Sequence, residues 1–130
     1  MNANQKGKRF EREVAKILNQ KFDSNVRRTP MSGGMDNFKG DIIDINPDSP
    51  LYDFHWECKN QEKLNIWKAL AQARADKPMG KIPVVVFTKN FENNYACLEL
   101  DDFLNLIKTI GLCLKSCDIS IKRLFSQLQS

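Results

Sequence analysis

The sequence is short of the residues on which several kinds of functional site depend. Its 130 residues include one histidine, His55, and four cysteines, Cys58, Cys97, Cys113 and Cys117. The cysteines lack the paired short spacing of a zinc site, and no histidine accompanies them at ligand spacing. We therefore interpret them as reduced and mostly small core residues. A disulfide between Cys113 and Cys117, which could share a helical face, is the less favoured alternative.

Long hydrophobic runs are also missing. No apolar stretch approaches the roughly 20 residues that span a bilayer, and the polar, basic N-terminus lacks the apolar core of a signal peptide. We therefore expect a cytoplasmic protein with no membrane partner, in the host cytoplasm if the protein is viral. A hydrophobic content of 42% and a charged content of 28% are ordinary for a globular protein. At this length we predict one domain, residues 1–130, with residues from about 111 to 130 as a C-terminal helical extension.

Acidic residues are scarce at the N-terminal end. Through Arg28 the chain has eight Lys and Arg against three Asp and Glu, a net charge of +5, whereas the whole chain has +4. The remaining residues are therefore close to neutral. A basic end on an otherwise balanced domain suits a surface that follows a phosphate backbone. A helix whose charges only confer solubility would look similar.

Two short strand-like segments carry the most informative side chains. In the segment 54–60, Phe54, Trp56 and Cys58 alternate with His55, Glu57 and Lys59, so one strand face is apolar and the other polar. A second such run, 39–45, contains Asp41, and the intervening Asn46-Pro47-Asp48-Ser49-Pro50 is rich in turn formers. A hairpin of the two runs brings Asp41 toward Glu57 and Lys59.

Two carboxylates and a lysine at one sheet edge predict a site for a hard divalent cation. Oxygen ligands hold Mg²⁺ without removing all of its waters. A cation there can activate water and neutralise charge on a phosphate, while Lys59 orients the water or stabilises the transition state. This chemistry is phosphodiester hydrolysis. A solvated face with weak surface ion pairs is the alternative, and the pattern alone does not decide between them.

The other segments predict helices packed on a mixed sheet. Apolar spacing predicts a helix over about 4–22, with Phe10, Val14, Ile17, Leu18 and Phe22 buried and Glu11 at the border of that stripe. Further elements are a short extended piece at 26–29, a glycine-containing loop at 30–37, a helix from Asn65 to Lys77, strands at 82–88 and 95–100, a helix from Asp101 or Asp102 to Gly111, and an amphipathic segment from 118.

For two of these helices the sequence does not decide what one of their faces contacts. In the helix after Asn65, Trp67, Leu70 and Ala71 form the expected apolar stripe, and Gln72 lies just beside it, facing either the site or water. In the last segment Ile121, Leu124, Phe125 and Leu128 recur at helical spacing. That stripe either closes the core or forms a dimer contact.

At this point the sequence resembles a known superfamily. Gly40-Asp41 followed by Glu57-Cys58-Lys59 resembles the split signature of PD-(D/E)XK nucleases, with glycine in place of the proline. The segment Gly7 to Glu13 resembles the opening of archaeal-type Holliday junction resolvases, in which a glycine precedes an active-site glutamate by four residues. Arg28 and Ser32, four residues apart, resemble that family's arginine and serine. The resemblance covers roughly residues 7–90 and is specific only around these motifs.

The resemblance implies a restriction-endonuclease-like α/β core of the αβββαβ type, with a mixed central sheet flanked by helices. It implies that Asp41, Glu57 and the backbone carbonyl of Cys58 bind Mg²⁺, which Mn²⁺ can replace, and that Glu11 completes the site directly or through water. Lys59 would act on the nucleophilic water. Residues implied or placed near the DNA are Arg9, Arg12, Arg28, Ser32 and Lys39, and Gln72 is a possible accessory residue that resembles a helix glutamine of other superfamily branches.

The function predicted from the sequence is a Mg²⁺-dependent DNA endonuclease, with a homodimeric resolvase of four-way or other branched DNA as the favoured subclass. The alternatives are a restriction-like, nicking or single-strand nuclease on the same core, and a nucleic-acid-binding module with no catalysis. The loop before Asp41 and the hairpin between Asp41 and Glu57 are longer than in compact resolvases, and the segment from Gly111 has no counterpart. These departures bear on junction specificity and not on the metal site.

Overall fold

The computed structural model describes residues 2–30, 40–116 and 119–129, with side chains from 123 onward in the last range. Ser32 and Lys39 lie outside these residues. Two compact units divide at Leu98 and Glu99. The elements are α1 (Ala3–Phe22), β1 (Arg27–Arg28), β2 (Ile42–Ile43), β3 (Phe54–Asn60), α2 (Ile66–Asp76), β4 (Ile82–Thr88), β5 (Tyr95–Cys97), α3 (Leu100–Ser116) and α4 (Ile119–Leu128).

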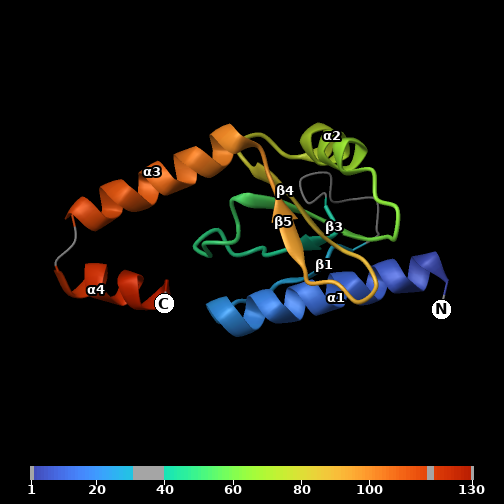
Figure 1. The fold of residues 1–130 in the computed structure, drawn as a ribbon, viewed down its shortest axis with the longest axis horizontal. Coiled ribbons are helices and arrows are strands. Elements are labelled where there is room, and N and C mark those ends of the chain that lie inside the picture. Colours follow the sequence, from blue (N-terminus) through green and yellow to red (C-terminus); the bar gives the residue numbers. More distant parts are fainter. Residues whose placement is uncertain (1, 31–39, 117–118, 130) are drawn as a thin grey trace. The chain divides into compact units, whose positions relative to one another are not determined.

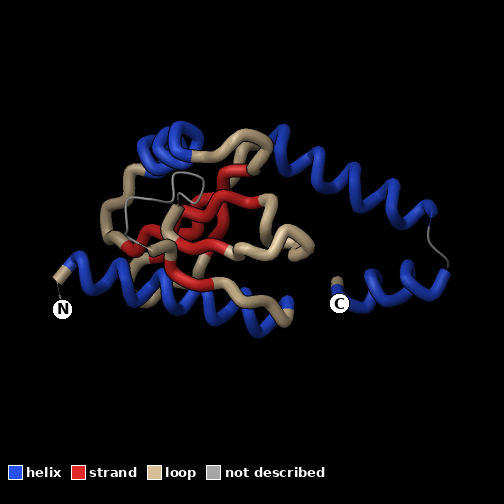
Figure 2. Tube along the Cα trace, turned by 180° about the vertical axis from the view of Figure 1, so that it is seen from behind, coloured by secondary structure: helices blue, strands red, loops and turns tan. Residues whose placement is uncertain are grey.

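The first unit is a five-stranded mixed sheet with one helix on each face (Figures 1 and 2). The strand order follows the chain, β1-β2-β3-β4-β5, and the only parallel pair among these described strands is β3 with β4, which α2 connects. The remaining neighbours are antiparallel. A parallel pair needs such a crossover, whereas antiparallel neighbours can be joined by turns. The predicted mixed α/β fold class is therefore confirmed.

Helix α1 covers one face of the sheet. Asn2 caps it by accepting a hydrogen bond of 2.9 Å from the N–H of Gln5. Phe10, Val14 and Ala15 are buried against Trp56 and other apolar residues of the sheet. The predicted stripe is correct at Phe10 and Val14 and wrong at its C-terminal end, since Ile17 and Phe22 are exposed and Ala15 takes the inner position.

One amide joins the end of α1 to the start of β1. The side chain of Asn19 donates 2.9 Å to the carbonyl oxygen of Val26 and accepts 2.6 Å from the N–H of Val26. Its oxygen also accepts from the hydroxyl of Ser24 at 2.9 Å. Asn19 therefore bonds to Val26 as a neighbouring strand would, and fixes the turn that precedes Arg27 and Arg28.

Helix α2 covers the opposite face, and of the predicted apolar stripe only the partly buried Leu70 packs there, whereas Trp67 and Ala71 are exposed. Asn65 is its N-cap, as expected, and accepts 3.1 Å from the N–H of Lys68. The buried residues are Ala69 and Ala73, against Val85, whereas Trp67 is 79% exposed. Small alanines face the sheet because they let the helix approach it closely. The bulky Trp67 is left on the outer side.

Strand β3 is buried on both faces, which corrects the expectation of one solvated polar face. Trp56 and Cys58 pack toward α1, while His55 and Glu57, on the other face, are 2% and 3% exposed. They are enclosed because β4 pairs with β3 at its edge and α2 packs on this face of the sheet, against Val85. His55 and Glu57 are therefore inside the protein and do not form a solvated hairpin face.

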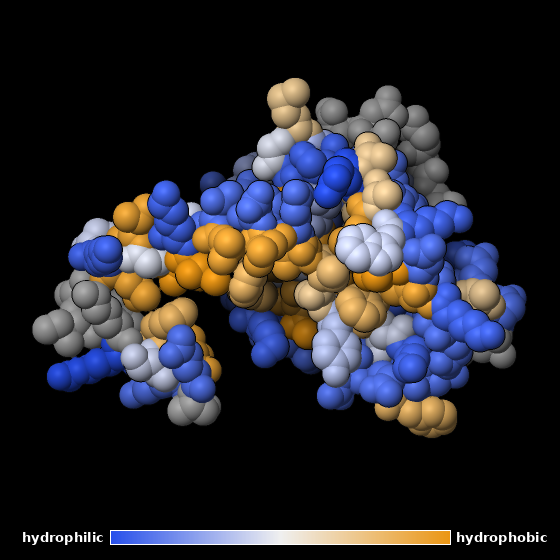
Figure 3. Space-filling model, turned by 45° about the horizontal axis from the view of Figure 1, so that its top comes forward, coloured by the Kyte–Doolittle hydropathy of each residue, from blue (hydrophilic) through white to orange (hydrophobic). Residues whose placement is uncertain are grey.

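The second unit, residues 99–130, contains α3 and α4. Helix α3 continues through Gly111 to Ser116, so the predicted end at Gly111 is wrong. Asp101 and Asp102 lie in its first turn and are not its N-cap. Their negative charges interact favourably there with the positive end of the helix dipole. Apolar side chains gather along α3 (Figure 3), including exposed Phe103, Leu104, Ile107 and Ile110. Among helices with described placement, none is both long and apolar enough to cross a membrane.

Candidate functional site

Asp41 stands where the β2 strand begins. The N–H of Asp41 donates 2.9 Å to the carbonyl oxygen of Trp56, and the carbonyl oxygen of Asp41 accepts 3.0 Å from the N–H of Thr29. Both bonds extend the sheet ladder by one residue and hold Asp41 against β3. Its side chain accepts 2.7 Å from the N–H of Cys58. The hairpin therefore brings Asp41 to the middle of β3, as the sequence predicted.

Gly40 explains why the residue before Asp41 is not proline. Its φ of 103° lies in the range that only glycine adopts readily, and proline cannot adopt it because its ring fixes φ near −65°. A Cβ atom there would also lie 2.9 Å from the carbonyl oxygen of Trp56 and 3.2 Å from Cε1 of His55. Glycine thus allows the chain to pass directly over β3.

Glu57 is held from within the protein by His55. The Nε2 atom of His55 lies 3.1 Å from Oε1 of Glu57, and both side chains are almost completely buried. A hydrogen bond to the ionised carboxylate requires the proton on Nε2. The Nδ1 atom of His55 is buried and has no partner among the residues that the structure describes. His55 was not predicted as a site residue, although its position two residues before Glu57 on a strand signals that the two share a face.

Glu11 approaches from α1 and is already paired. Its Oε2 atom accepts 2.6 Å from Nε of Arg28, with side-chain exposures of 17% for Glu11 and 27% for Arg28. Glu11 follows the buried Phe10 directly, which places it at the border of the apolar stripe. Glu11 therefore lies near the sheet edge, as expected. Its charge is neutralised by the guanidinium of Arg28.

Lys59 and Gln72 come together from different elements. The Nζ atom of Lys59, on β3, donates 3.3 Å to Oε1 of Gln72, on α2. The sequence left open whether Gln72 faces the site or water, and this contact orients it toward Lys59. This contact therefore directs the Lys59 amine toward Gln72.

The carboxylates influence each other strongly. Burial raises the pKa of Asp41 to about 7, with further increases from the negative charges of Glu57 and then Glu11 and an opposing decrease from the Cys58 N–H. Burial also raises the pKa of the Cys58 thiol, helped by the charge of Asp41. The thiol therefore stays protonated and inert. Three acidic side chains, from α1, from the residue before β2 and from β3, thus share one electrostatic environment.

A cavity of about 360 Å³ opens onto Asp41 and Glu11, whereas Glu57 is buried behind it and is not one of its lining residues. Glu11, Arg28, Asp41, Cys58 and Lys59 line it, all of which the sequence predicted. Residues that the sequence did not predict complete its wall, namely Ala3, Asn4, Gly7, Lys8, Asn60 and Gln61. Asn4, Gly7, Lys8 and Glu11 recur at spacings of three, one and three, the spacing of one helix face, and this signal could have found Asn4 and Lys8.

The residues present suit Mg²⁺ better than a cation that needs a full protein cage. In the part of the chain with described placement, no three His, Cys, Asp or Glu side chains form a metal-binding group. Mg²⁺ commonly uses one or two carboxylates and keeps several waters. Asp41 and Glu57 could supply these carboxylates, and burial together with the charge of Glu57 raises the pKa of Asp41. Glu11 would join only after leaving Arg28 or through a water.

The predicted DNA-binding arginines lie around the cavity and not all within it. Arg28 lines both the cavity and a groove of about 630 Å³ between α1 and β1, in which Arg12, Lys16 and Arg27 also take part. Arg9 faces a different groove and pairs with Glu13 at 3.3 Å. Every charged residue lining the groove between α1 and β1 is basic, so that groove suits a polyanion.

Comparison with known families gives one match. The model of a family described as "Phage putative PDDEXK endonuclease" matches residues 2–124, which is nearly the whole chain. No curated protein and no solved structure matches the chain. The matched range includes Glu11, Asp41, Glu57 and Lys59 and covers most of both compact units.

Proposed function

Because the chain belongs to this family of PDDEXK endonucleases, we propose that it is a Mg²⁺-dependent DNA endonuclease that cleaves branched DNA, with four-way junctions as the favoured substrate. The observation that carries the proposal is the placement of Asp41, which is close enough to Glu57 and Glu11 to feel their charges and lines the same cavity as Lys59. Asp41 directly precedes β2, Glu57 is on β3 and Glu11 is on α1, and burial, followed by the charges of Glu57 and Glu11, raises the pKa of Asp41. Such a cluster costs stability unless it binds a cation.

Each side chain of the site has a distinct proposed role. Asp41 and Glu57, with the Cys58 carbonyl, would hold the cation, which supplies Lewis-acid stabilisation and an acidified water when bound. His55 keeps the Glu57 carboxylate in one orientation from the buried side. Lys59, oriented by Gln72, is suited to stabilise charge on the phosphate or to direct the attacking water. Arg28 exchanges Glu11 for a phosphate oxygen as DNA enters.

A substrate panel tests the proposal. The full chain is incubated with Mg²⁺ and with linear, nicked, flapped and four-way DNA of matched sequence, with Mn²⁺ in parallel. We expect cutting that requires the metal and is fastest on the four-way substrate. Equal rates on all four would overturn the branched-DNA subclass and leave another nuclease on this fold, such as a nicking or restriction-like enzyme.

Paired variants test the site itself. Glu57→Ala together with Lys59→Ala should abolish cleavage, while DNA binding through the basic surface of α1 and β1 persists. The matched control is Lys68→Ala on α2, an exposed lysine on the helix that covers the other face of the sheet. If the double variant still cuts at the wild-type rate, the assignment of the site is wrong.

A second candidate function is a DNA-binding module without catalysis. The pairing of Glu11 with Arg28 at 2.6 Å favours it, since this contact leaves only two carboxylates for a cation. Binding of DNA by the wild-type chain without cleavage in Mg²⁺, Mn²⁺ or other divalent cations would support this candidate. Metal-dependent cleavage that is lost in the Glu57 and Lys59 double variant would eliminate it.

A homodimer is part of the resolvase proposal, because two strands must be cut across a junction. The exposed apolar residues of α3 support it: Phe103, Leu104, Ile107 and Ile110 recur at helical spacing in the second unit. A row of this kind usually marks an interaction surface. Light scattering should give a dimer mass for the full chain and a monomer mass for Leu104→Glu with Ile107→Glu. A monomeric wild type would remove the dimer from the proposal.

A further inference from the structure

A turn beside the catalytic cavity presents an aromatic ring to solvent. Lys89 to Glu92 form the turn after β4, closed by a 3.2 Å hydrogen bond from the N–H of Glu92 to the carbonyl oxygen of Lys89. Phe91, the third residue of the turn, has a φ of 64° and is fully exposed. Glycine or asparagine normally occupies this position, because positive φ strains a residue with a bulky side chain.

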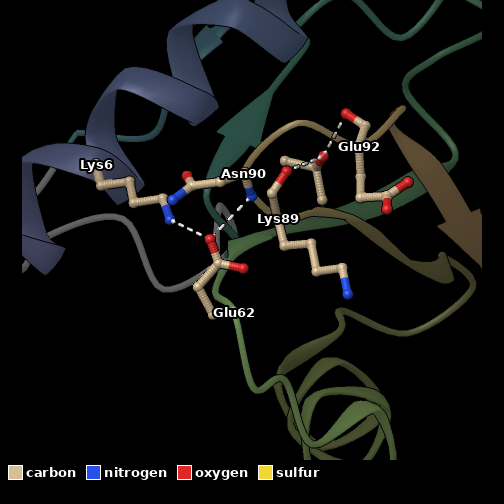
Figure 4. Close-up of polar contacts among 6 residues, drawn as sticks. Lys6, Glu62, Lys89, Asn90 and Glu92 are labelled. Atoms are coloured by element: carbon tan, nitrogen blue, oxygen red, sulfur yellow. Dashed lines mark hydrogen bonds and ion pairs between the residues drawn. The ribbon is translucent and has the colours of Figure 1, made fainter.

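The turn is fixed in place and is not a loose connection (Figure 4). The N–H of Asn90 donates 3.1 Å to Oε1 of Glu62, which also lies 3.8 Å from Nζ of Lys6 on α1. The hydroxyl of Thr88 lies 3.0 to 3.2 Å from three carbonyl oxygens, those of Lys89, Glu92 and Asn93. The protein thus holds Phe91 in a strained conformation without burying its ring, and such strain is typical of functional positions.

The ring borders a polar groove that continues from the catalytic cavity. This groove, of about 510 Å³, lies between α1 and the turn. Asn60 lines both the groove and the cavity, and its Oδ1 atom is buried without a hydrogen-bond partner among the residues with described placement. A DNA strand that leaves the cavity past Asn60 would therefore reach Phe91.

The groove suits a nucleic acid better than an apolar protein segment. Only Phe10 and Phe91 are apolar among its lining residues. The lining cations are Lys6, Arg9 and Lys89, and the lining carboxylates are Glu13 and Glu92. Lys6 pairs with Glu62 at 3.8 Å and Arg9 with Glu13 at 3.3 Å. Surface pairs of this kind contribute little, so both cations can turn to phosphates at small cost.

We propose that Phe91 stacks on an unpaired nucleobase of the DNA strand that leaves the catalytic cavity past Asn60. Lys6, Arg9 and Lys89 contact the phosphates on either side of that base. The inference rests on the proposed function and specifies its substrate: DNA with unpaired bases near the cut, as at a flap, gap or junction centre. An aromatic side chain can stack on any base, so this recognition does not depend on sequence.

The test measures binding without cleavage, in EDTA, with the full chain. Two duplexes of matched sequence are compared, one fully paired and one with a three-nucleotide gap that carries 2-aminopurine. Phe91→Ala should weaken binding to the gapped duplex about tenfold, as expected from loss of one base–aromatic stack, and change binding to the paired duplex less than about twofold. Wild type should quench 2-aminopurine, and Phe91→Ala should not.

Three further variants separate stacking from folding. Phe91→Trp should restore both binding and quenching, because a larger ring stacks at least as well. Phe91→Asn tolerates the positive φ, so it should keep the wild-type Tm and show the same loss as Phe91→Ala. Met79→Ala removes another fully exposed apolar side chain away from the groove and should change nothing.

Two results would overturn the inference: equal binding of Phe91→Ala and Met79→Ala to the gapped duplex, or an equal loss on both duplexes. Because the measurement needs no metal, stacking can fail while cleavage is intact. It can also persist in a chain that does not cut, so the failure of this inference and the failure of the proposed function are distinguishable.

Discussion

The backbone N–H of Cys58 donates a 2.7 Å hydrogen bond to Oδ2 of Asp41, joining the acid at the start of β2 to the middle of β3. This bond stabilises the ionised form of Asp41, yet its pKa is raised to about 7, because burial and the charges of Glu57 and Glu11 outweigh it. In the absence of a cation, Asp41 is therefore largely protonated below neutral pH.

Without metal, the protein should become less stable as the pH rises toward 7. The pKa of Asp41 is about 7 in the folded protein, against about 3.9 in an unfolded chain. The folded state therefore binds more protons between these values, and the contribution of Asp41 to stability is lost as the pH rises through about 7. Asp41→Asn removes this titration and should raise the Tm at pH 8 in EDTA by several degrees. An equal Tm of wild type and variant at pH 8 would contradict the prediction.

Cation binding should release a proton below neutral pH. A divalent cation requires Asp41 to be ionised, so the Mg²⁺ concentration at half-saturation should fall as the pH rises from 6 to about 7.5 and change little above that. Calorimetry in two buffers with different ionisation enthalpies counts the released protons. Asp41→Asn is the control and should show neither the pH dependence nor the proton release.

Loss of the Lys59 amine should affect the rate more than the affinity. Lys59→Ala should lower the single-turnover rate by roughly 100-fold or more, the usual effect of removing a charge-stabilising group, and leave DNA affinity in EDTA within about twofold. Gln72→Ala should lower the rate less, by about tenfold or below, because Gln72 only orients Lys59. A Gln72→Ala effect larger than that of Lys59→Ala would reverse the roles assigned to the two side chains.

Arg28→Ala should act on two measurements in opposite directions. It removes a phosphate contact, so DNA binding should weaken uniformly across sequences. The plot of the logarithm of the association constant against the logarithm of salt concentration should become less steep by about 0.9. It also frees Glu11 from its 2.6 Å partner, so less Mg²⁺ should be needed for half-saturation. Lys68→Ala, which removes one charge from α2, is the matched control. An unchanged salt slope would remove Arg28 from the DNA surface.

The glycine inside α3 offers a test of the second unit. A Cβ atom at Gly111 would meet no other atom within 4 Å, and the residue is helical. Gly111→Ala should therefore stabilise α3 by about 0.5–1 kcal/mol, because alanine loses less backbone entropy on folding. Helix content and the melting curve of the full chain measure this. A destabilised variant would mean that α3 packs closely at Gly111.

Local sequence signals predicted the elements well where capping and periodicity agree. Asn65 begins α2 as its N-cap, and the apolar run 82–88 is β4. The signals were misleading where tertiary packing decides. Trp67 is the largest apolar residue of α2 and is exposed, because close packing of the helix on Val85 selects Ala69 and Ala73. Hydrophobicity alone does not report how near a helix lies to its sheet.

For the candidate site, the sequence predicted which side chains come together but not how they are enclosed. Asp41, Cys58, Lys59, Glu11 and Arg28 line one cavity, as motif order and the hairpin implied. The buried contact between His55 and Glu57 could not be foreseen, because the alternation of β3 indicates a shared face but not that α2 and β4 enclose it. The catalytic roles of these residues remain predictions that the variants above test.

The three hydrogen bonds of Asn19 determine where this fold can accept insertions. Because one amide holds both the N–H and the carbonyl oxygen of Val26, an insertion at 23–25 that shifts Val26 would separate β1 from α1. Arg28 would then lose its register with Glu11. Evolution, or a designer grafting a new specificity onto this scaffold, would therefore vary other loops and leave this short connection at its present length.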